Sequence, residues 1–119
     1  MPKDHFFFNR QRYEVIDRAF LGKKEFLISR QLSSGPRRRF QAFDPIAGPR
    51  GALRILQFMP RTDQSWQRVG VLQRLSQHNP ELPQIVEFHR YGDEIATVET
   101  WIEGRDLRWF IRKMRDSSR

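Results

Sequence analysis

The 119-residue sequence contains no cysteine, which excludes a disulfide framework and a thiolate metal site. Its three histidines, His5, His78 and His89, are far apart in the chain and do not suggest a zinc or di-metal centre. No apolar run approaches the roughly 18 residues that a membrane-spanning helix needs. The aromatic run at residues 5–8 is too short for a signal peptide. These absences predict a soluble, cytoplasmic protein with no metal and no membrane partner.

Arginine and aromatic side chains are abundant instead. Lysine and arginine number 22 against 14 acidic residues, and the net charge is +8. Ten phenylalanines and three tryptophans argue against disorder and are enough for one modest core in a single domain. The charge gathers at Arg37–Arg39 and in the tail from Arg105 onward. Such clusters can bind nucleic acid or an acidic partner, or can simply form a solvated hairpin edge that deters aggregation.

The patterning predicts an α+β domain: an antiparallel sheet of about five strands with one packed helix and a C-terminal helix. The helix over 64–77 is expected to begin after an Asp63 cap and to bury Trp66, Val69, Leu72 and Leu75. Residues that favour strands predict strands at 13–20 and 25–32, alternation of polar and apolar residues predicts one at 38–43, and an apolar run predicts a central strand at 52–58. Turn residues predict a hairpin of 85–91 with 95–101.

The expected organisation is one domain with three parts. Residues 1–24 are an N-terminal extension, residues 25–104 carry the sheet and its helix, and residues 105–119 form the final helix. That helix places Leu107, Phe110, Ile111 and Met114 at positions i, i+3, i+4 and i+7, so one side is apolar.

Three segments in this order resemble the small lobe of serine/threonine protein kinases. Residues 40–56, with Ala42, Asp44, Gly48 and Ala52, are similar to the second and third strands of that family. Residues 72–86, with His78-Asn79-Pro80, are similar to the end of its C helix and the following strand. Residues 101–107 resemble its hinge. The resemblance covers roughly residues 25–115 and implies a kinase-like small-lobe fold.

The resemblance also shows which parts of the catalytic apparatus are missing. The phosphate-covering loop keeps only Gly35, and Arg54 stands where the family has its strand-three lysine. Residues 64–80 contain no carboxylate, so the family's lysine–glutamate pair has no acidic member in this helix. No catalytic-loop or DFG segment follows within the 119 residues. We therefore expect no enzymatic activity from these residues.

The resemblance implies that Gly35, Arg54, Glu99 and Trp101 occupy vestigial nucleotide-site positions. Glu99 takes the place of an apolar gatekeeper and is a candidate partner for Arg54 across the sheet. The alternative interpretations are that Gly35 is an ordinary turn residue and that Arg54 extends its charge out of a central strand into solvent. We expect no bound cofactor, with Mg-ATP as the ligand to test.

The first hypothesis for function is a catalytically inactive kinase-like lobe that binds another protein or a second copy of itself. The exposed apolar surface expected for that contact includes Trp109, Phe110 and Met114. The second hypothesis is the N-terminal part of a longer kinase or pseudokinase with residual ATP binding. The third is a small basic nucleic-acid-binding domain, which the net charge favours but no recognised motif supports.

Overall fold

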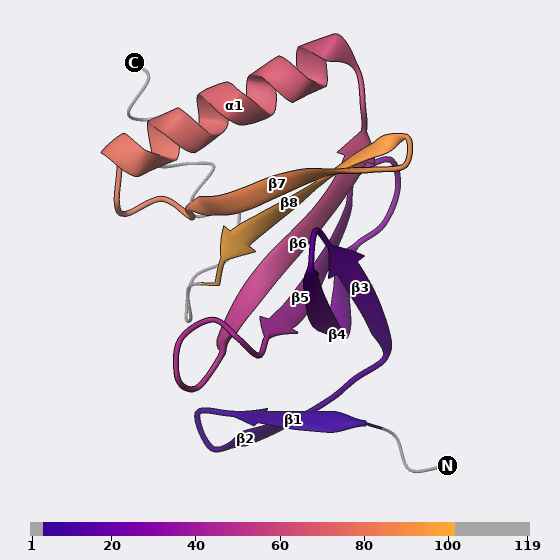
Figure 1. Ribbon diagram of the computed structural model, residues 1–119, viewed down its shortest axis with the longest axis vertical. Helices are drawn as coiled ribbons and strands as arrows, with labels where there is room; N and C mark the ends of the chain where they lie inside the picture. Colours follow the sequence, from indigo (N-terminus) through magenta and orange to yellow (C-terminus); the bar gives the residue numbers. More distant parts are fainter. Residues whose placement is uncertain (1–3, 102–119) are drawn as a thin grey trace.

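The structure is a computed structural model that describes residues 4–101 (Figure 1). The predicted α+β class, with antiparallel strands and one helix, is confirmed for this part of the chain, but the strands outnumber the expected five. The predicted final helix, with Trp109, Phe110 and Met114, lies outside the described residues. The elements in chain order are β1 (His5–Phe8), β2 (Gln11–Glu14), β3 (Asp17–Leu21), β4 (Lys24–Ser33), β5 (Arg38–Asp44), β6 (Ala52–Pro60), α1 (Asp63–His78), β7 (Ile85–Tyr91) and β8 (Glu94–Thr100).

Six strands form one antiparallel sheet in the order β3-β4-β5-β6-β8-β7, and β1 and β2 form a separate hairpin. The single strand predicted over 13–20 is wrong, because the chain leaves the hairpin after Glu14 and enters the large sheet at Asp17. The segment expected as an N-terminal extension thus supplies an edge strand. The β1–β2 turn lacks the glycine that usually marks such a turn in a sequence, because Asn9 and Arg10 adopt the positive φ angles of 50° and 66° themselves.

The large sheet is curled so that its two edge regions approach each other. The Lys24 side chain of β4 reaches Glu87 of β7, although β5, β6 and β8 lie between these strands. The turn between β3 and β4 also packs against β7: a Cβ on Gly22, which has a φ of +62°, would lie 3.2 Å from Cε1 of His89. We call the side on which these groups meet the concave face. Its apolar core consists of Ala19, Leu21, Phe26, Ile28, Ala42, Leu56, Phe58, Ala96 and Val98.

Two separate elements cover the opposite side, which we call the outer face. Helix α1 lies along β7, where the Trp66 ring meets the Phe88 ring edge-on at 5.1 Å (Figure 1). The β1–β2 hairpin lies at the other end of the molecule, where Phe6 stacks on Phe43 of β5 at 4.4 Å. Phe43 and Phe88 both alternate with residues of the concave face, so α1 and the β1–β2 hairpin pack on the same side of the sheet.

Helix α1 begins one residue earlier than expected, because Thr62 rather than Asp63 is its N-cap. The Thr62 hydroxyl accepts a hydrogen bond from the Ser65 amide at 3.0 Å, and the Ser65 hydroxyl accepts one from the Thr62 amide at 2.7 Å. This reciprocal capping box satisfies two amides that the first turn would otherwise leave free. Asp63 then lies in the first turn, where its charge favours the helix dipole.

The predicted buried face of α1 is only partly correct. Val69 is buried and Trp66 is half-buried, but Leu72 and Leu75 are 42% and 53% exposed. Because α1 packs mainly on the edge strand β7, only a narrow side of the helix is covered. The covered side is polar towards the end of the helix, where the side-chain amide of Gln73 donates a hydrogen bond to the Ile85 carbonyl at 3.3 Å and Ser76 is buried.

Candidate functional site

The structure places the predicted nucleotide-site residues Arg54 and Glu99 on opposite faces of the sheet. Arg54 lies opposite Ala42 and Thr100 and belongs to the concave face, whereas Glu99 lies opposite Ile55 and belongs to the outer face. Successive residues of a strand point to opposite sides, so neighbouring strands cannot bring these two side chains together. The predicted Arg54–Glu99 pair is therefore not formed.

Glu99 faces a different arginine. Its Oε2 lies 3.8 Å from an Nη of Arg39, close enough for an ion pair but too far for a hydrogen bond. Burial raises the pKa of the Glu99 carboxyl, and the Arg39 charge offsets that effect only in part. Oε2 of Glu99 and Nε of Arg39 are buried without a hydrogen-bond partner. The pair is thus an incompletely satisfied polar group on the outer face, an arrangement that is uncommon in folded proteins.

Gly35 and Trp101 lie near opposite ends of the sheet. Gly35, with a φ of +100°, is in the loop that leads to Arg38, which pairs with Phe58. Trp101 follows Thr100, which pairs with Arg54 four residues earlier on β6. The structure therefore does not bring the four predicted positions together.

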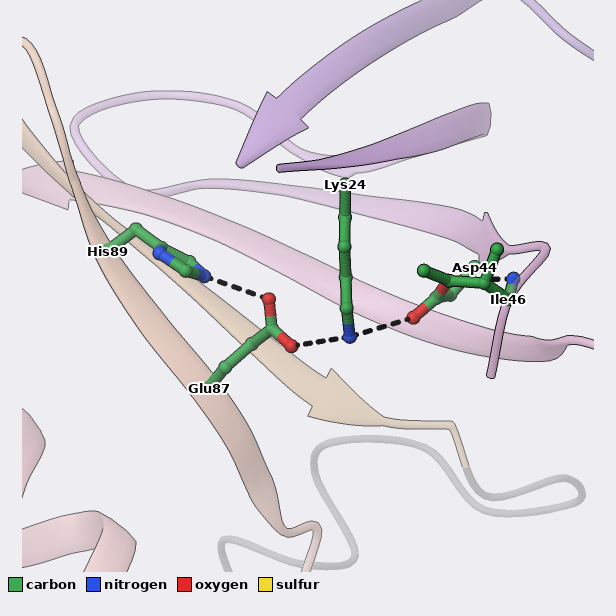
Figure 2. Close-up of polar contacts among 5 residues, drawn as sticks. All are labelled: Lys24, Asp44, Ile46, Glu87 and His89. Carbon is green, nitrogen blue, oxygen red and sulfur yellow. Dashed lines mark hydrogen bonds and ion pairs between the residues drawn. The ribbon is translucent and has the colours of Figure 1, made fainter. Parts of the chain in front are cut away.

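A chain of charged side chains connects β4, β5 and β7 on the concave face (Figure 2). Lys24 Nζ lies 3.0 Å from Glu87 Oε2 and 3.5 Å from Asp44 Oδ2. The other Glu87 oxygen lies 2.8 Å from His89 Nε2, and Asp44 Oδ1 accepts a hydrogen bond from the Ile46 amide at 3.1 Å. We call Lys24, Asp44, Glu87 and His89 the polar clasp, since it joins β4 and β5 to β7.

Within the polar clasp, the pKa shifts of Lys24 and Glu87 favour the charged forms of these two side chains. The hydrogen bond to Glu87 raises the pKa of Lys24 against the opposing effect of burial. Burial alone would raise the pKa of Glu87, but hydrogen bonds from His89 and Lys24 outweigh it and leave the pKa below its ordinary value. Asp44 is only 2% exposed, so its partnership with Lys24 compensates a buried charge. The arrangement stabilises the curl of the sheet.

Sequence reasoning missed the polar clasp because its members are distant in the chain. Lys24 and Glu87 are separated by 63 positions, and nothing in the local pattern pairs them. Within residues 4–101, no group of three or more histidine, cysteine or acidic side chains is arranged to hold a metal ion. The one described helix is neither long nor apolar enough to cross a membrane.

The outer side of α1 carries an exposed apolar stripe. Val71, Leu72 and Leu75 are exposed and follow Arg68 at spacings of three, four and seven residues. That spacing puts all four on one side of a helix. We call Val71, Leu72 and Leu75 the α1 stripe. Large apolar side chains grouped in this way are typical of a protein-binding surface.

Comparisons with known proteins do not assign a family. No model of a known protein family matches the chain, and no curated protein matches it significantly. The kinase resemblance therefore remains a prediction from the sequence.

Proposed function

We propose that this chain is a catalytically inactive, kinase-like small lobe that works by binding another protein. The order of elements supports the proposal: from β4 onward, three strands are followed by one helix and then a hairpin, the order that the resemblance implies. The fold adds an edge strand and the β1–β2 hairpin ahead of this core.

The observation that carries the inactive assignment is the side of the sheet on which α1 packs. Helix α1 covers the outer face through Trp66 and Phe88, whereas Arg54 is on the concave face. The helix also contains no carboxylate after Asp63. A lysine–glutamate type of pair between β6 and α1 is therefore excluded both by side-chain chemistry and by geometry, and kinase catalysis requires such a pair.

The α1 stripe is the surface that supports protein binding. It offers three neighbouring aliphatic side chains, and the charged residues of α1 beyond its first turn are Arg68 and Arg74. A partner that matches it would be an amphipathic helix with an apolar seam and acidic flanks. A second copy is a poorer match, because two stripes would bring arginines together between chains that each carry a charge of +8.

The inactive assignment is tested by thermal unfolding with and without millimolar Mg-ATP. We expect no shift in Tm, because the nucleotide-site residues are not brought together. A ligand present far above its Kd would stabilise the fold by several kcal/mol, so binding of Mg-ATP would be visible as a higher Tm. A saturable increase in Tm with Mg-ATP would overturn this part of the proposal and favour the hypothesis of a kinase-like lobe that retains ATP binding.

Protein binding is tested with a synthetic helical peptide that carries a leucine seam flanked by glutamates. We expect it to bind the 119-residue chain, and we expect Leu72→Ser with Leu75→Ser to weaken binding at least about tenfold through lost apolar burial. The matched control is Gln77→Ser, an exposed position of α1 away from the stripe. Equal binding of a peptide with lysine flanks, or equal loss in the control, would refute this surface.

A further inference from the structure

A pocket of about 510 Å³ lies between the β1–β2 hairpin and the outer face of the large sheet. One wall is β2, and the other is built from β4, β5 and Trp101 after β8. This volume falls within the range of small-molecule sites. The pocket is separate from the α1 stripe and involves neither Arg54 nor the polar clasp.

The walls of the pocket are held by aromatic packing. Phe6 stacks on Phe43 at 4.4 Å and on Tyr13 at 5.0 Å, which fixes β2 against the sheet. Trp101 packs against the same outer-face cluster, which has Phe6, Phe43 and Leu53 at its centre. Tyr13 and Trp101 therefore line the pocket as rings on supported elements rather than on free loops.

A β-bulge directs two polar residues into the pocket. The register of β4 shifts between Ile28 and Arg30, so Ser29 and Arg30 both lie beside Gln41 of β5. Gln41 is only 7% exposed, and its side-chain oxygen accepts a hydrogen bond from the Ser29 hydroxyl at 3.0 Å. Bulges are often found beside binding sites because they re-aim side chains. A buried amide held in this way provides a fixed polar group in the wall.

The described lining residues carry more positive than negative charge. Arg12 and Arg30 are exposed, and within residues 4–101 neither forms an ion pair. Glu14 is the single carboxylate among the described lining residues. A planar guanidinium binds carboxylate or phosphate oxygens through paired hydrogen bonds. Arg30, which lies opposite Gln41 in the sheet register, thus supplies a guanidinium for an anion beside two aromatic rings, whereas Arg12 alternates with Tyr13 along β2.

We propose that this pocket binds a small organic anion in which a carboxylate or phosphate group is attached to a flat ring. Arg30 binds the anionic group, the rings of Tyr13 and Trp101 contact the flat body, and the amide of Gln41 hydrogen-bonds to it. The inference does not depend on the kinase-like function: it uses neither Arg54 nor α1, and Trp101 enters it only as a ring in the pocket wall.

The test is a titration of the 119-residue chain with four probes, followed by tryptophan fluorescence and by chemical shifts of the Trp101 indole. Phenyl phosphate and benzoate carry both features, inorganic phosphate carries only the anion, and benzyl alcohol carries only the ring. We expect one or both ring-bearing anions to bind at least about tenfold more tightly than the single-feature probes, because two kinds of contact combine. The stronger of the two identifies phosphate or carboxylate as the preferred group.

One variant checks the role of the arginine. Arg30→Gln should weaken binding of the preferred probe about tenfold, because it removes a charge-assisted contact. The position is exposed, so Tm should change little. Arg50→Gln is the control, since Arg50 is exposed but not part of the pocket. Absence of saturable binding up to ~10 mM probe, equally tight binding of benzyl alcohol, or an equal loss in Arg50→Gln would overturn the proposal.

Discussion

The two faces of the large sheet differ in how completely their carboxylates are satisfied. On the concave face, Asp44 and Glu87 each have partners within the polar clasp. On the outer face, Oε2 of Glu99 is buried without a hydrogen-bond partner. Each face also has an arginine whose buried Nε lacks a partner, Arg54 on the concave face and Arg39 on the outer face, so the difference concerns the acids. The outer face also holds the pocket under the β1–β2 hairpin, which is a feature expected of a binding surface.

The largest expected loss of stability comes from removing a core side chain of the concave face. Phe26 is fully buried on the concave face, so Phe26→Ala should destabilise the fold by about 3–5 kcal/mol. Urea unfolding of the 119-residue chain measures the change. A loss below about 1 kcal/mol would show that the concave core is not the main source of stability.

A smaller loss is expected from the polar clasp. Glu87→Gln should lower stability by about 1 kcal/mol at neutral pH, a value that allows for the partial exposure of its partners. The pKa of Glu87 lies below its ordinary value in the folded chain, so its contribution is present above the unfolded pKa of about 4.3.

That contribution should disappear as the pH falls through the folded pKa of Glu87. Unfolding at a series of pH values should therefore show the wild type and Glu87→Gln converging in acid. The exposed Asp93→Asn variant, in the turn of the same hairpin, is the control. A difference between wild type and Glu87→Gln that persists unchanged in acid would contradict a charged clasp.

A change of opposite sign is expected on the outer face. Burial raises the pKa of Glu99, so its ionisation opposes folding. Wild-type stability should fall, relative to Glu99→Gln, as the pH rises from about 4.3 towards the folded pKa. Measured in the same pH series, Glu99→Gln and Glu87→Gln should show opposite trends. Parallel trends would remove the electrostatic distinction between the faces.

The smallest effect is expected from the α1 stripe. Leu75 is 53% exposed, so Leu75→Ser should change stability by no more than about 0.5 kcal/mol. The matched measurement is Val69→Ser, at a buried position of the same helix, which should destabilise by well over 1 kcal/mol. A large loss in Leu75→Ser would show that this side chain is part of the core.

Local patterns in the sequence were sufficient for the elements that have strong signals. The strands from Lys24 to Pro60, the helix over 63–78 and the hairpin around Gly92-Asp93 follow from strand-forming residues, helical periodicity and turn residues, although the helix cap was assigned to Asp63 instead of Thr62. The β1–β2 hairpin could not be predicted in this way, because its turn uses Asn9 and Arg10 at positive φ without a glycine.

The candidate sites were harder to predict than the elements. The expected contact between Arg54 and Glu99 depended on the register of β6 with β8, and a shift of one residue moves a side chain to the other face. The burial of Leu72 and Leu75 depended on how much of the sheet α1 would cover. Neither quantity is encoded in a short stretch of sequence.

The amino-acid sequence alone determined the α+β class and the absence of an acidic side chain along α1 after Asp63, because both follow from residue types and their local periodicity. Only the tertiary structure decided the polar clasp, the side of the sheet that each cover occupies and the pocket under the hairpin. These features depend on the curl of the sheet and on strand register, which bring together residues as distant as Lys24 and Glu87.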